Sequence, residues 1–350
     1  MITKFPIARD DTWYLAWPDV ALHGGTRLVC VFASCTHHGN RDRTQIMCTA
    51  SDDRGQTWSA PWPITEETRG DPKTVPYWNC PRITALADGR LIAVIDRITQ
   101  DGGGVAENHL LASADGGRSW SAPRRIPVEG IVPDRLIVLR HGPHAGRWLV
   151  SAHARADAQW RSQQRVWWSD DQGTTWLGPS VVARSAELFL CEGSILELPG
   201  GELACFLREN SFTGIDCHVA LSRDSGLTWG EPWRFPLPGC HRPVAGLLDT
   251  GEVLITHRYL HGGQGWTGWW TQNTFAALTD TASVLAGERS KAHARIMPLD
   301  FDRSPKSDCG YTGWVQFADG GIYVVNYCVD DWQRGQIRGY AFRREDMLLP

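Results

Sequence analysis

The sequence has no long apolar run and little helical periodicity. No stretch of about 18 consecutive apolar residues occurs, so we predict no membrane-spanning helix. The first residues, Met1 to Pro6, lack the apolar segment of a secretory signal peptide. Few segments keep a helical period for more than two turns, which excludes a mainly helical fold.

The chain also lacks an excess of positive charge. It has 35 Lys and Arg against 39 Asp and Glu, a formal net charge of −4, and no basic stripe. Nucleic acid is therefore excluded as an expected partner. No Cys and His spacing is typical of a zinc site. The glycine run Gly102-Gly103-Gly104 is not followed by the Lys and Ser/Thr of a phosphate-binding loop. We expect no metal and no cofactor.

A cysteine framework typical of secreted proteins is missing as well. The ten Cys are scattered through strand-like segments, and no signal peptide precedes them. Such cysteines are typical of buried free thiols. The location that we expect is therefore cytoplasmic.

Trp, Gly and Pro are abundant, with 18, 36 and 20 copies, and this composition favours an all-β array of short strands. One phrase, Ser-x-Asp-x-Gly-x-(Ser/Thr)-Trp, occurs at 51–58, 113–120, 169–176 and 222–229. The copies start 62, 56 and 53 residues apart, a period typical of propellers and solenoids. Asp and Gly favour a tight turn, the hydroxyls satisfy its backbone groups, and Trp anchors it. We therefore expect these four turns to be structural.

Strand-like segments divide the chain into six units. Their first strands begin near Tyr14, Cys80, Val132, Cys191, Cys240 and Cys309. Six units predict an all-β, six-bladed β-propeller of four-stranded antiparallel blades, with residues 1–350 as a single domain. The last unit shows only three strands. We therefore expect the N-terminal segment 2–7 to add its outer strand and close the ring, which removes an exposed sheet edge.

In a propeller the first strand of each blade lines the central channel, and its side chains alternate between two faces. When the blades are aligned on the apolar residue before each Gly turn, four blades place a charged or aromatic residue on one face. These residues are Arg82, Glu192, Arg242 and Tyr311. The simpler alternative is that one or two of them form salt bridges between blades. The convergence predicts a site at one end of the channel.

The repeated phrase resembles the Asp-box, or BNR repeat, of the sialidase superfamily, and the blade layout is similar over essentially the whole chain. In that family the fourth blade opens with a Glu and continues to a strand that ends in Arg, as Glu192 and Arg208 do here. The sixth blade opens with a Tyr, here Tyr311. The resemblance implies that Tyr311 is a nucleophile and Glu192 its base, because a phenol with a pKa of about 10 needs a carboxylate to take its proton.

The resemblance also implies a general acid on a loop of the first blade, ahead of its Asp-box. Asp42 lies on that loop, and the alternative reading is an ordinary solvated carboxylate. His37 and His38 precede it on the same loop and are rival acids or substrate contacts.

Sialidases hold the substrate carboxylate with three Arg, because guanidinium groups bind carboxylates in a bidentate way. The head of the first blade, where the family has an Arg, reads Trp17-Pro18-Asp19, and the nearest Arg-Ile phrase contains Arg82. The substrate-binding candidates are Arg82, Arg208, Arg242, Arg258, His241, His38 and Asp19. Arg208 has the alternative of a structural ion pair with Glu192 or Glu209. The displaced Arg favours an acidic sugar other than ordinary sialic acid, or a differently oriented one.

Three functions follow as alternatives. The first is a sialidase-like exo-glycoside hydrolase that releases a terminal acidic sugar, either sialic acid or a related ulosonic or uronic acid, by a retaining mechanism. The second is a propeller polysaccharide lyase that acts on uronate glycans through a His or Tyr, with His241 beside Arg242. The third is a non-catalytic glycan-binding propeller. The aromatic run Trp266 to Trp270 fits sugar stacking, a dimer surface or blade packing.

Overall fold

The computed structural model describes residues 2–100, 104–154, 159, 161–261 and 271–348. Within these ranges α1, Thr281–Val284, is the only α-helix, and η1, Arg289–Lys291, and η2, Arg344–Met347, are single 3-10 turns. None of the described helices is long and apolar enough to cross a membrane. The aromatic run Trp266 to Trp270 and part of the glycine run at 102–104 lie outside the described residues.

The chain divides into two compact units. The first comprises Met1–Ile126, Ile131–Pro133 and Phe301–Pro350. It contains sheets of order β2-β3-β4-β5, with β6 also paired to β4, then β10-β9-β8-β7, and β1-β25-β24-β23. The strand bounds are β1 Thr3–Ala8, β2 Tyr14–His23, β3 Arg27–His37, β4 Asn40–Ser51, β5 Trp62–Pro63, β6 Thr68–Arg69, β7 Tyr77–Ala85, β8 Leu91–Ile98, β9 Ala106–Ser113, β10 Arg124–Glu129, β23 Gly313–Gln316, β24 Gly321–Cys328 and β25 Gln336–Arg343.

The second unit comprises Pro127–Gly130 and Asp134–Asp300. Its sheets have the orders β11-β12-β13-β14, β15-β16-β17-β18 and β19-β20-β21-β22. The strand bounds are β11 Ile137–Val138, β12 Trp148–Ala154, β13 Ser162–Ser169, β14 Leu177–Ser185, β15 Leu190–Glu197, β16 Leu203–Glu209, β17 Asp216–Ser222, β18 Trp233–Pro238, β19 Cys240–Leu247, β20 Val253–His261, β21 Thr271–Thr279 and β22 Arg295–Phe301. Six such sheets confirm the predicted all-β, six-bladed propeller, and the single-domain assignment stays a prediction.

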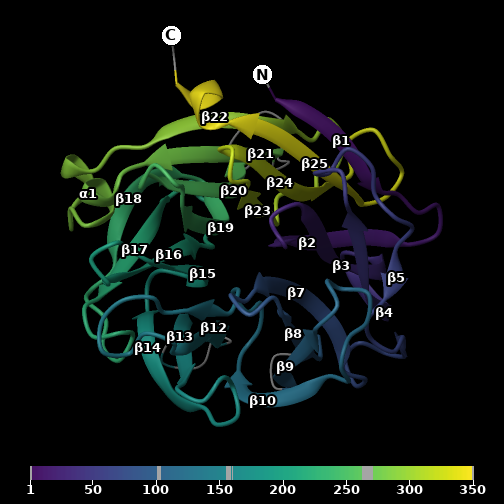
Figure 1. The fold of residues 1–350 in the computed structure, drawn as a ribbon, viewed down its shortest axis with the longest axis horizontal. Helices are drawn as coiled ribbons and strands as arrows, with labels where there is room; N and C mark the ends of the chain where they lie inside the picture. Colours follow the sequence, from purple (N-terminus) through teal and green to yellow (C-terminus); the bar gives the residue numbers. More distant parts are fainter. Residues whose placement is uncertain (1, 101–103, 155–158, 160, 262–270, 349–350) are drawn as a thin grey trace. The chain divides into compact units, whose positions relative to one another are not determined.

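The N-terminal strand completes the sixth blade, as the sequence predicts. β1 pairs antiparallel with β25 from Thr3 opposite Ala341 to Ala8 opposite Ile337. Figure 1 shows β1 running beside β25. The pairing covers an edge of β25 that would otherwise present unpaired backbone groups.

The third blade differs from its prediction in its first strand. The segment from Val132 to Leu136 forms no strand, and β11 contains only Ile137 and Val138. Val132 has a φ of 50°, outside the β region, and Pro133 has no N–H to donate to a ladder. The inner strand of this blade is therefore reduced to a short pairing with β12.

The four Asp-boxes are self-contained turns, as expected. In the first, Thr57 donates to Asp53 through its backbone N at 2.9 Å and its hydroxyl at 2.6 Å. Gly55 N donates to Ser51 Oγ at 2.7 Å, and Trp58 Nε1 donates to Gly55 O at 3.2 Å. The bonds from Thr57 and Ser51 lower the pKa of Asp53 to about 2. The other three boxes repeat this pattern.

The first box also fastens its blade to the sixth blade. Tyr323 donates its hydroxyl to Gly55 O at 3.0 Å, and a Cβ added at Gly55 would lie 2.1 Å from the Tyr323 ring. Gly55 has a φ of 88°. Only glycine satisfies both conditions, since an L side chain is disfavoured at this φ and has no room beside the ring.

We expect Gly55→Ala to lower the free energy of unfolding by about 2 kcal/mol more than Gly89→Ala does. Gly89 is the matched control, because its φ is 87° and a Cβ added there meets nothing within 4 Å. Both variants share the backbone cost, so the difference isolates the clash with Tyr323. Chemical denaturation followed by circular dichroism measures both values. Equal losses would contradict the proposed role of the contact.

Candidate functional site

The first strands of several blades carry an irregularity at matching positions. The register shifts between Ala16 and Asp19, between Trp78 and Pro81, between Cys191 and Ser194, and between His241 and Val244. Such bulges bend a strand and redirect side chains, and they are frequent next to active sites. Three non-glycine residues within them have a positive φ, namely Trp17 at 54°, Glu192 at 46° and Arg242 at 53°. Two of these three are predicted site residues.

The register also aligns three arginines on the second strands. Arg97 lies opposite Trp78, Arg208 opposite Cys191 and Arg258 opposite His241, in each case just before the bulge of the first strand. Arg208 and Arg258 therefore occupy equivalent places in β16 and β20. Arg82 lies after the bulge of β7, opposite Val94. An alignment of the blades by sequence alone ignores bulges. It therefore places Arg82 and Glu192 on the same face, although Arg82 follows the bulge of β7 and Glu192 lies within the bulge of β15.

In the first unit, a partly buried carboxylate accepts hydrogen bonds from two tyrosines and contacts a histidine. Asp308 accepts hydrogen bonds from Tyr14 Oη at 2.5 Å and from Tyr327 Oη at 2.8 Å, and its Oδ2 contacts His38 Nδ1. Burial alone would raise the pKa of Asp308, but the charge of His38 and these hydrogen bonds outweigh it and lower the pKa to about 2. Burial and the adjacent Asp308 charge raise the pKa of Tyr14 well above its ordinary value. At neutral pH Asp308 is thus ionised and the adjacent Tyr14 is neutral.

Aromatic rings surround this carboxylate. Trp17 meets the His38 ring edge-to-face at 5.2 Å between centroids and lies 5.9 Å from Tyr327. The predicted nucleophile Tyr311 is 8% exposed, and its ring lies 6.3 Å from that of Tyr327. We call these residues the Asp308 cluster: Tyr14, Trp17, His38, Asp308, Tyr311 and Tyr327. The structure therefore brings two predicted site residues, His38 and Tyr311, into one group.

The predicted acid Asp42 lies outside the Asp308 cluster. Its carboxylate is exposed, accepts a hydrogen bond from Thr36 Oγ1, and accepts another from Asn40 Nδ2 at 3.2 Å. The bond from Thr36, and then the one from Asn40, lower the pKa of Asp42. Asp42 is thus an ionised carboxylate on the surface of the β4 strand.

Two other predicted contacts in this unit are fully buried. Asp19 is 0% exposed, and its carboxylate accepts from the backbone N of Val20 and of Ile83, both at 2.9 Å. Arg82 is 1% exposed and donates to the backbone oxygen of Thr312 at 3.0 Å, while its Nε lies 3.9 Å from Asp19. These contacts tie the first strands of neighbouring blades together.

The second unit holds a cationic group around one carboxylate. Glu192 and Arg208 form an ion pair of 2.7 Å, and both side chains are nearly buried. Arg258 donates to Gln272 at 3.1 Å. Burial lowers the pKa of His241 far below its usual value, and the charges of Arg208 and Arg258 lower it further. We call the residues Glu192, Arg208, His241 and Arg258 the Glu192 cluster. Its imidazole is neutral and its guanidinium groups are charged.

Arg242, also a predicted clamp residue, is fully buried and contacts the backbone of Glu192. It is 0% exposed, its Nη1 lies 4.0 Å from Asp134 and it donates to the backbone oxygen of Glu192 at 3.5 Å. Asp134 in turn accepts from the backbone N of Ile195 at 2.8 Å, as Asp19 does from Ile83. Arg242 and Arg82 therefore share one pattern, in which a buried guanidinium approaches a buried Asp that binds the next blade's backbone.

Both clusters lie at the ends of their strands opposite to the Asp-boxes. His38 lies two residues before Asn40, the first residue of β4, whereas the first box begins at Ser51, the last residue of that 12-residue strand, which is about 35 Å long. In the fourth blade, Arg208 is near the end of β16, and the fourth box begins at Ser222, where the antiparallel β17 ends. In each of these blades the Asp-box and the cluster therefore lie at opposite ends of the strands.

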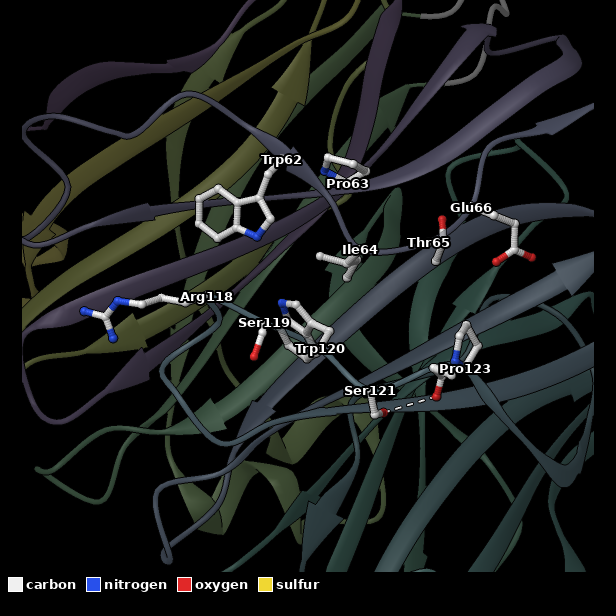
Figure 2. Close-up of a pocket in the computed structure, with 11 residues that line it drawn as sticks. Trp62, Pro63, Ile64, Thr65, Glu66, Arg118, Ser119, Trp120, Ser121 and Pro123 are labelled. Carbon is white, nitrogen blue, oxygen red and sulfur yellow. Dashed lines mark hydrogen bonds between the residues drawn. The ribbon is translucent and has the colours of Figure 1, made fainter.

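A shallow pocket in the first unit lies beside the second Asp-box instead. Trp62 and Ile64 face Ser119 and Trp120 across it (Figure 2). Glu66 and Arg118 also line this pocket, and no predicted site residue does. The pocket belongs to packing between the first two blades and adds nothing to the site.

Sequence reasoning missed the residue at the centre of the first cluster. Asp308 lies in the loop before the sixth blade and meets His38 from 270 positions away. In the sequence, Tyr14 and Tyr327 lie in strand-like segments and resemble ordinary aromatic core residues. The sequence signal that points to this cluster is the pair His37 and His38, which precedes Asp42 on the predicted loop.

No group of described His, Cys, Asp and Glu residues has the arrangement of a metal site. All ten cysteines are buried and none forms a disulfide, as the sequence predicts.

The six four-stranded blades and the four Asp-box turns place this protein in the class of Asp-box propellers. More specifically, the chain belongs to the BNR repeat-like domain family, whose sequence profile matches residues 26–324. The sialidase of Micromonospora viridifaciens is 31% identical over 137 residues, which cover 36% of this chain and 20% of that protein. A sialidase of Bacteroides fragilis is 25% identical over 235 residues, covering 61% of this chain and 41% of that protein.

The chain thus spans less than half the length of these sialidases. Among solved structures, a Dyadobacter fermentans protein of unknown function superposes with a TM-score of 0.77 at 22% identity, covering 98% of this chain and 99% of that one. This similarity shows the fold alone.

Proposed function

We propose that the protein is a sialidase-like exo-glycoside hydrolase that releases a terminal acidic sugar with retention of configuration. The observation that carries this proposal is the buried ion pair between Glu192 and Arg208, at 2.7 Å, beside a second guanidinium and a neutral imidazole. Burying several charged groups at the end of a strand costs desolvation free energy, and the stability of the blade does not require it. Such a group of charges suits a site that binds an anion.

Tyr311 is the proposed nucleophile and Glu192 the proposed base. A phenol at an anomeric centre next to a carboxylate avoids the repulsion that a carboxylate nucleophile would suffer. The ring of Tyr311 is nearly buried against Tyr327, which restricts its motion. The pairing of these two residues rests on the sequence resemblance, since each belongs to a different compact unit.

Arg208 and Arg258 are the proposed carboxylate clamp. They hold equivalent positions in β16 and β20, and both flank His241. Two guanidinium groups from adjacent blades suit a planar carboxylate, which accepts paired N–H bonds. The contacts of Arg82 and Arg242 with backbone oxygens and buried Asp residues favour a supporting role for these two arginines.

One observation favours the lyase as a second candidate. His241 is neutral, buried and next to Arg258, and its Nδ1 has no hydrogen-bond partner among the described residues. A neutral imidazole beside a guanidinium is suited to remove the proton next to a uronate carboxylate that the guanidinium neutralises. A lyase would leave an unsaturated sugar with a new ultraviolet absorbance, which a hydrolase does not produce.

The test is a panel of 4-nitrophenyl glycosides of sialic acid, other ulosonic acids and uronic acids, together with uronate polysaccharides. We expect release of nitrophenol from at least one acidic glycoside. The methyl ester of the same glycoside is the matched control, and its kcat/KM should be lower by about 100-fold or more because the clamp then lacks its anion. Ultraviolet absorbance on the polysaccharides would instead favour the lyase. Binding without any turnover would favour the non-catalytic propeller.

A further inference from the structure

We propose that His38, held by Asp308, is the residue that protonates the leaving oxygen. This inference rests on the proposed hydrolase function and replaces the sequence-based assignment of that role to Asp42. His38 is the proposed catalytic residue, and Asp308 is a positioning residue that acts through it.

The first support is the place of His38 in the chain. His37 pairs with Asn40 across the β3–β4 hairpin, so His38 and Gly39 form its two-residue tip. The His38 side chain is 41% exposed, while Asp308 beneath it is 17% exposed. One edge of the imidazole therefore meets a partly buried carboxylate, and the other remains accessible to a ligand.

The second support is that the carboxylate fixes which ring nitrogen is used. Nδ1 of His38 contacts Asp308 Oδ2, and the two tyrosine hydroxyls donate to the same carboxylate. Tyr14 and Tyr327 can only donate to an ionised carboxylate, so the remaining acceptor capacity of Asp308 selects a proton on Nδ1 of His38. Nε2 is then the nitrogen that exchanges a proton with another molecule.

The third support is that the ring and its loop are held in place. Trp17 lies edge-to-face against the His38 ring, and Arg41 stacks 3.7 Å above Trp17. Arg41 Nε also donates to the backbone oxygen of His38 at 2.9 Å. A catalytic group must keep its geometry through packing and hydrogen bonds of this kind.

Asp308 is itself anchored. Its backbone N donates to Asp302 Oδ2 at 3.0 Å, and the same oxygen accepts from Val329 N at 3.1 Å. Asp302 Oδ1 accepts from the backbone N of Ser304 and of Asp330, each at 3.0 Å. One buried carboxylate therefore fastens the loop that carries Asp308 to the end of β24.

Asp42, the rival acid, has a different environment. It lies on the exposed side of the hairpin, and its hydrogen bonds with Thr36 and Asn40 stabilise the ionised form. An acid that is already ionised has no proton to give at neutral pH.

The proposed reaction conserves atoms and charge in both of its steps. The glycosidic bond breaks with its electron pair on the leaving oxygen, which takes the Nε2 proton of the His38 imidazolium. The anomeric carbon forms a bond to Tyr311 Oη, whose proton passes to a base, the role that the sequence resemblance gives to Glu192. In the second step, the bond between the anomeric carbon and Tyr311 Oη breaks with its electron pair on that oxygen, which takes its proton back from the base. Water forms the new bond to the anomeric carbon through its hydroxyl and gives its other proton to His38 Nε2.

The test compares two leaving groups on the acidic sugar that the panel above identifies. We expect His38→Gln to lower kcat/KM, which reports the first step, on the methyl glycoside by about 10²–10³-fold and on the 4-nitrophenyl glycoside by about 10-fold or less, since nitrophenolate leaves without a proton. Sodium azide should restore turnover of the nitrophenyl substrate, because an anionic nucleophile needs no base. Asp308→Asn should show the same leaving-group dependence with a smaller loss. The matched control is His141→Gln, an exposed histidine outside both clusters, which should behave as the wild type.

Equal losses of His38→Gln on both substrates without azide rescue would overturn the proposal. It is equally refuted if Asp42→Asn shows the leaving-group dependence and His38→Gln does not.

¹⁵N NMR of the histidine rings gives a readout that needs no substrate. A proton on Nδ1 of His38 that is lost in Asp308→Asn supports the positioning role, and an unchanged tautomer contradicts it. A wild type inactive on the whole panel would refute the hydrolase function, while the NMR result still decides the His38–Asp308 contact.

Discussion

Tyr311→Phe should lower kcat on the active acidic glycoside by about 10⁴-fold, because the variant keeps the ring and removes the attacking oxygen. The aromatic contact with Tyr327 is retained, so the free energy of unfolding should change little. KM should change little as well, since the hydroxyl is needed for bond formation and not for binding the sugar carboxylate. Steady-state kinetics and thermal unfolding on the full chain measure these quantities.

Glu192→Gln is the companion variant and should lower kcat by a similar factor if it removes the phenol proton. Tyr323→Phe is the matched control. It also removes one phenolic hydroxyl, which donates to Gly55 O at 3.0 Å in the first Asp-box and makes no contact with Asp308 among the described hydrogen bonds. We expect this control to lose about 1 kcal/mol of stability and no activity. Unchanged activity in Tyr311→Phe would exclude it as the nucleophile.

The fold was predictable because its signals are local. Each Asp-box closes its own turn within eight residues, as Asp53 and Thr57 illustrate, so the phrase forms wherever it occurs. Its four copies set the blade spacing. The outer strand β1 was predictable for a different reason, since a last blade with three strands leaves an edge that only the N-terminal segment can cover.

The third blade shows where local reasoning ends. The segment at 132–136 is predicted to be a strand, but Val132 adopts a φ of 50° and the ladder starts only at Ile137. The same kind of irregularity shifts the register of β7 at Trp78 and Pro81. A pattern of period two cannot reveal a bulge, because one extra residue moves every following side chain to the other face.

The candidate site was predictable only in its parts. Glu192 and Arg208 were identified by their order along the fourth blade, and they do form an ion pair. His38 was one of two neighbouring histidines with no feature to separate them. What separates them is Asp308, which belongs to a distant loop, and contacts between residues so far apart in sequence leave no trace in periodicity or spacing.

Asp19→Ala should lower the free energy of unfolding by about 3–5 kcal/mol, since it leaves a buried guanidinium without its nearby carboxylate. Asp19 is 0% exposed, lies 3.9 Å from Arg82 Nε and accepts from the backbone N of Val20 and Ile83. Chemical denaturation followed by circular dichroism measures the loss.

A double-mutant cycle with Arg82→Met separates the two parts of that loss. With the guanidinium replaced by an apolar side chain, Asp19→Ala should cost markedly less, because only the two backbone N–H groups are then left without their acceptor. Asp88→Ala removes an exposed carboxylate that pairs with Arg90 and should leave the unfolding curve unchanged. A loss in Asp19→Ala below about 1 kcal/mol would contradict the structural role and return Asp19 to the substrate-binding candidates.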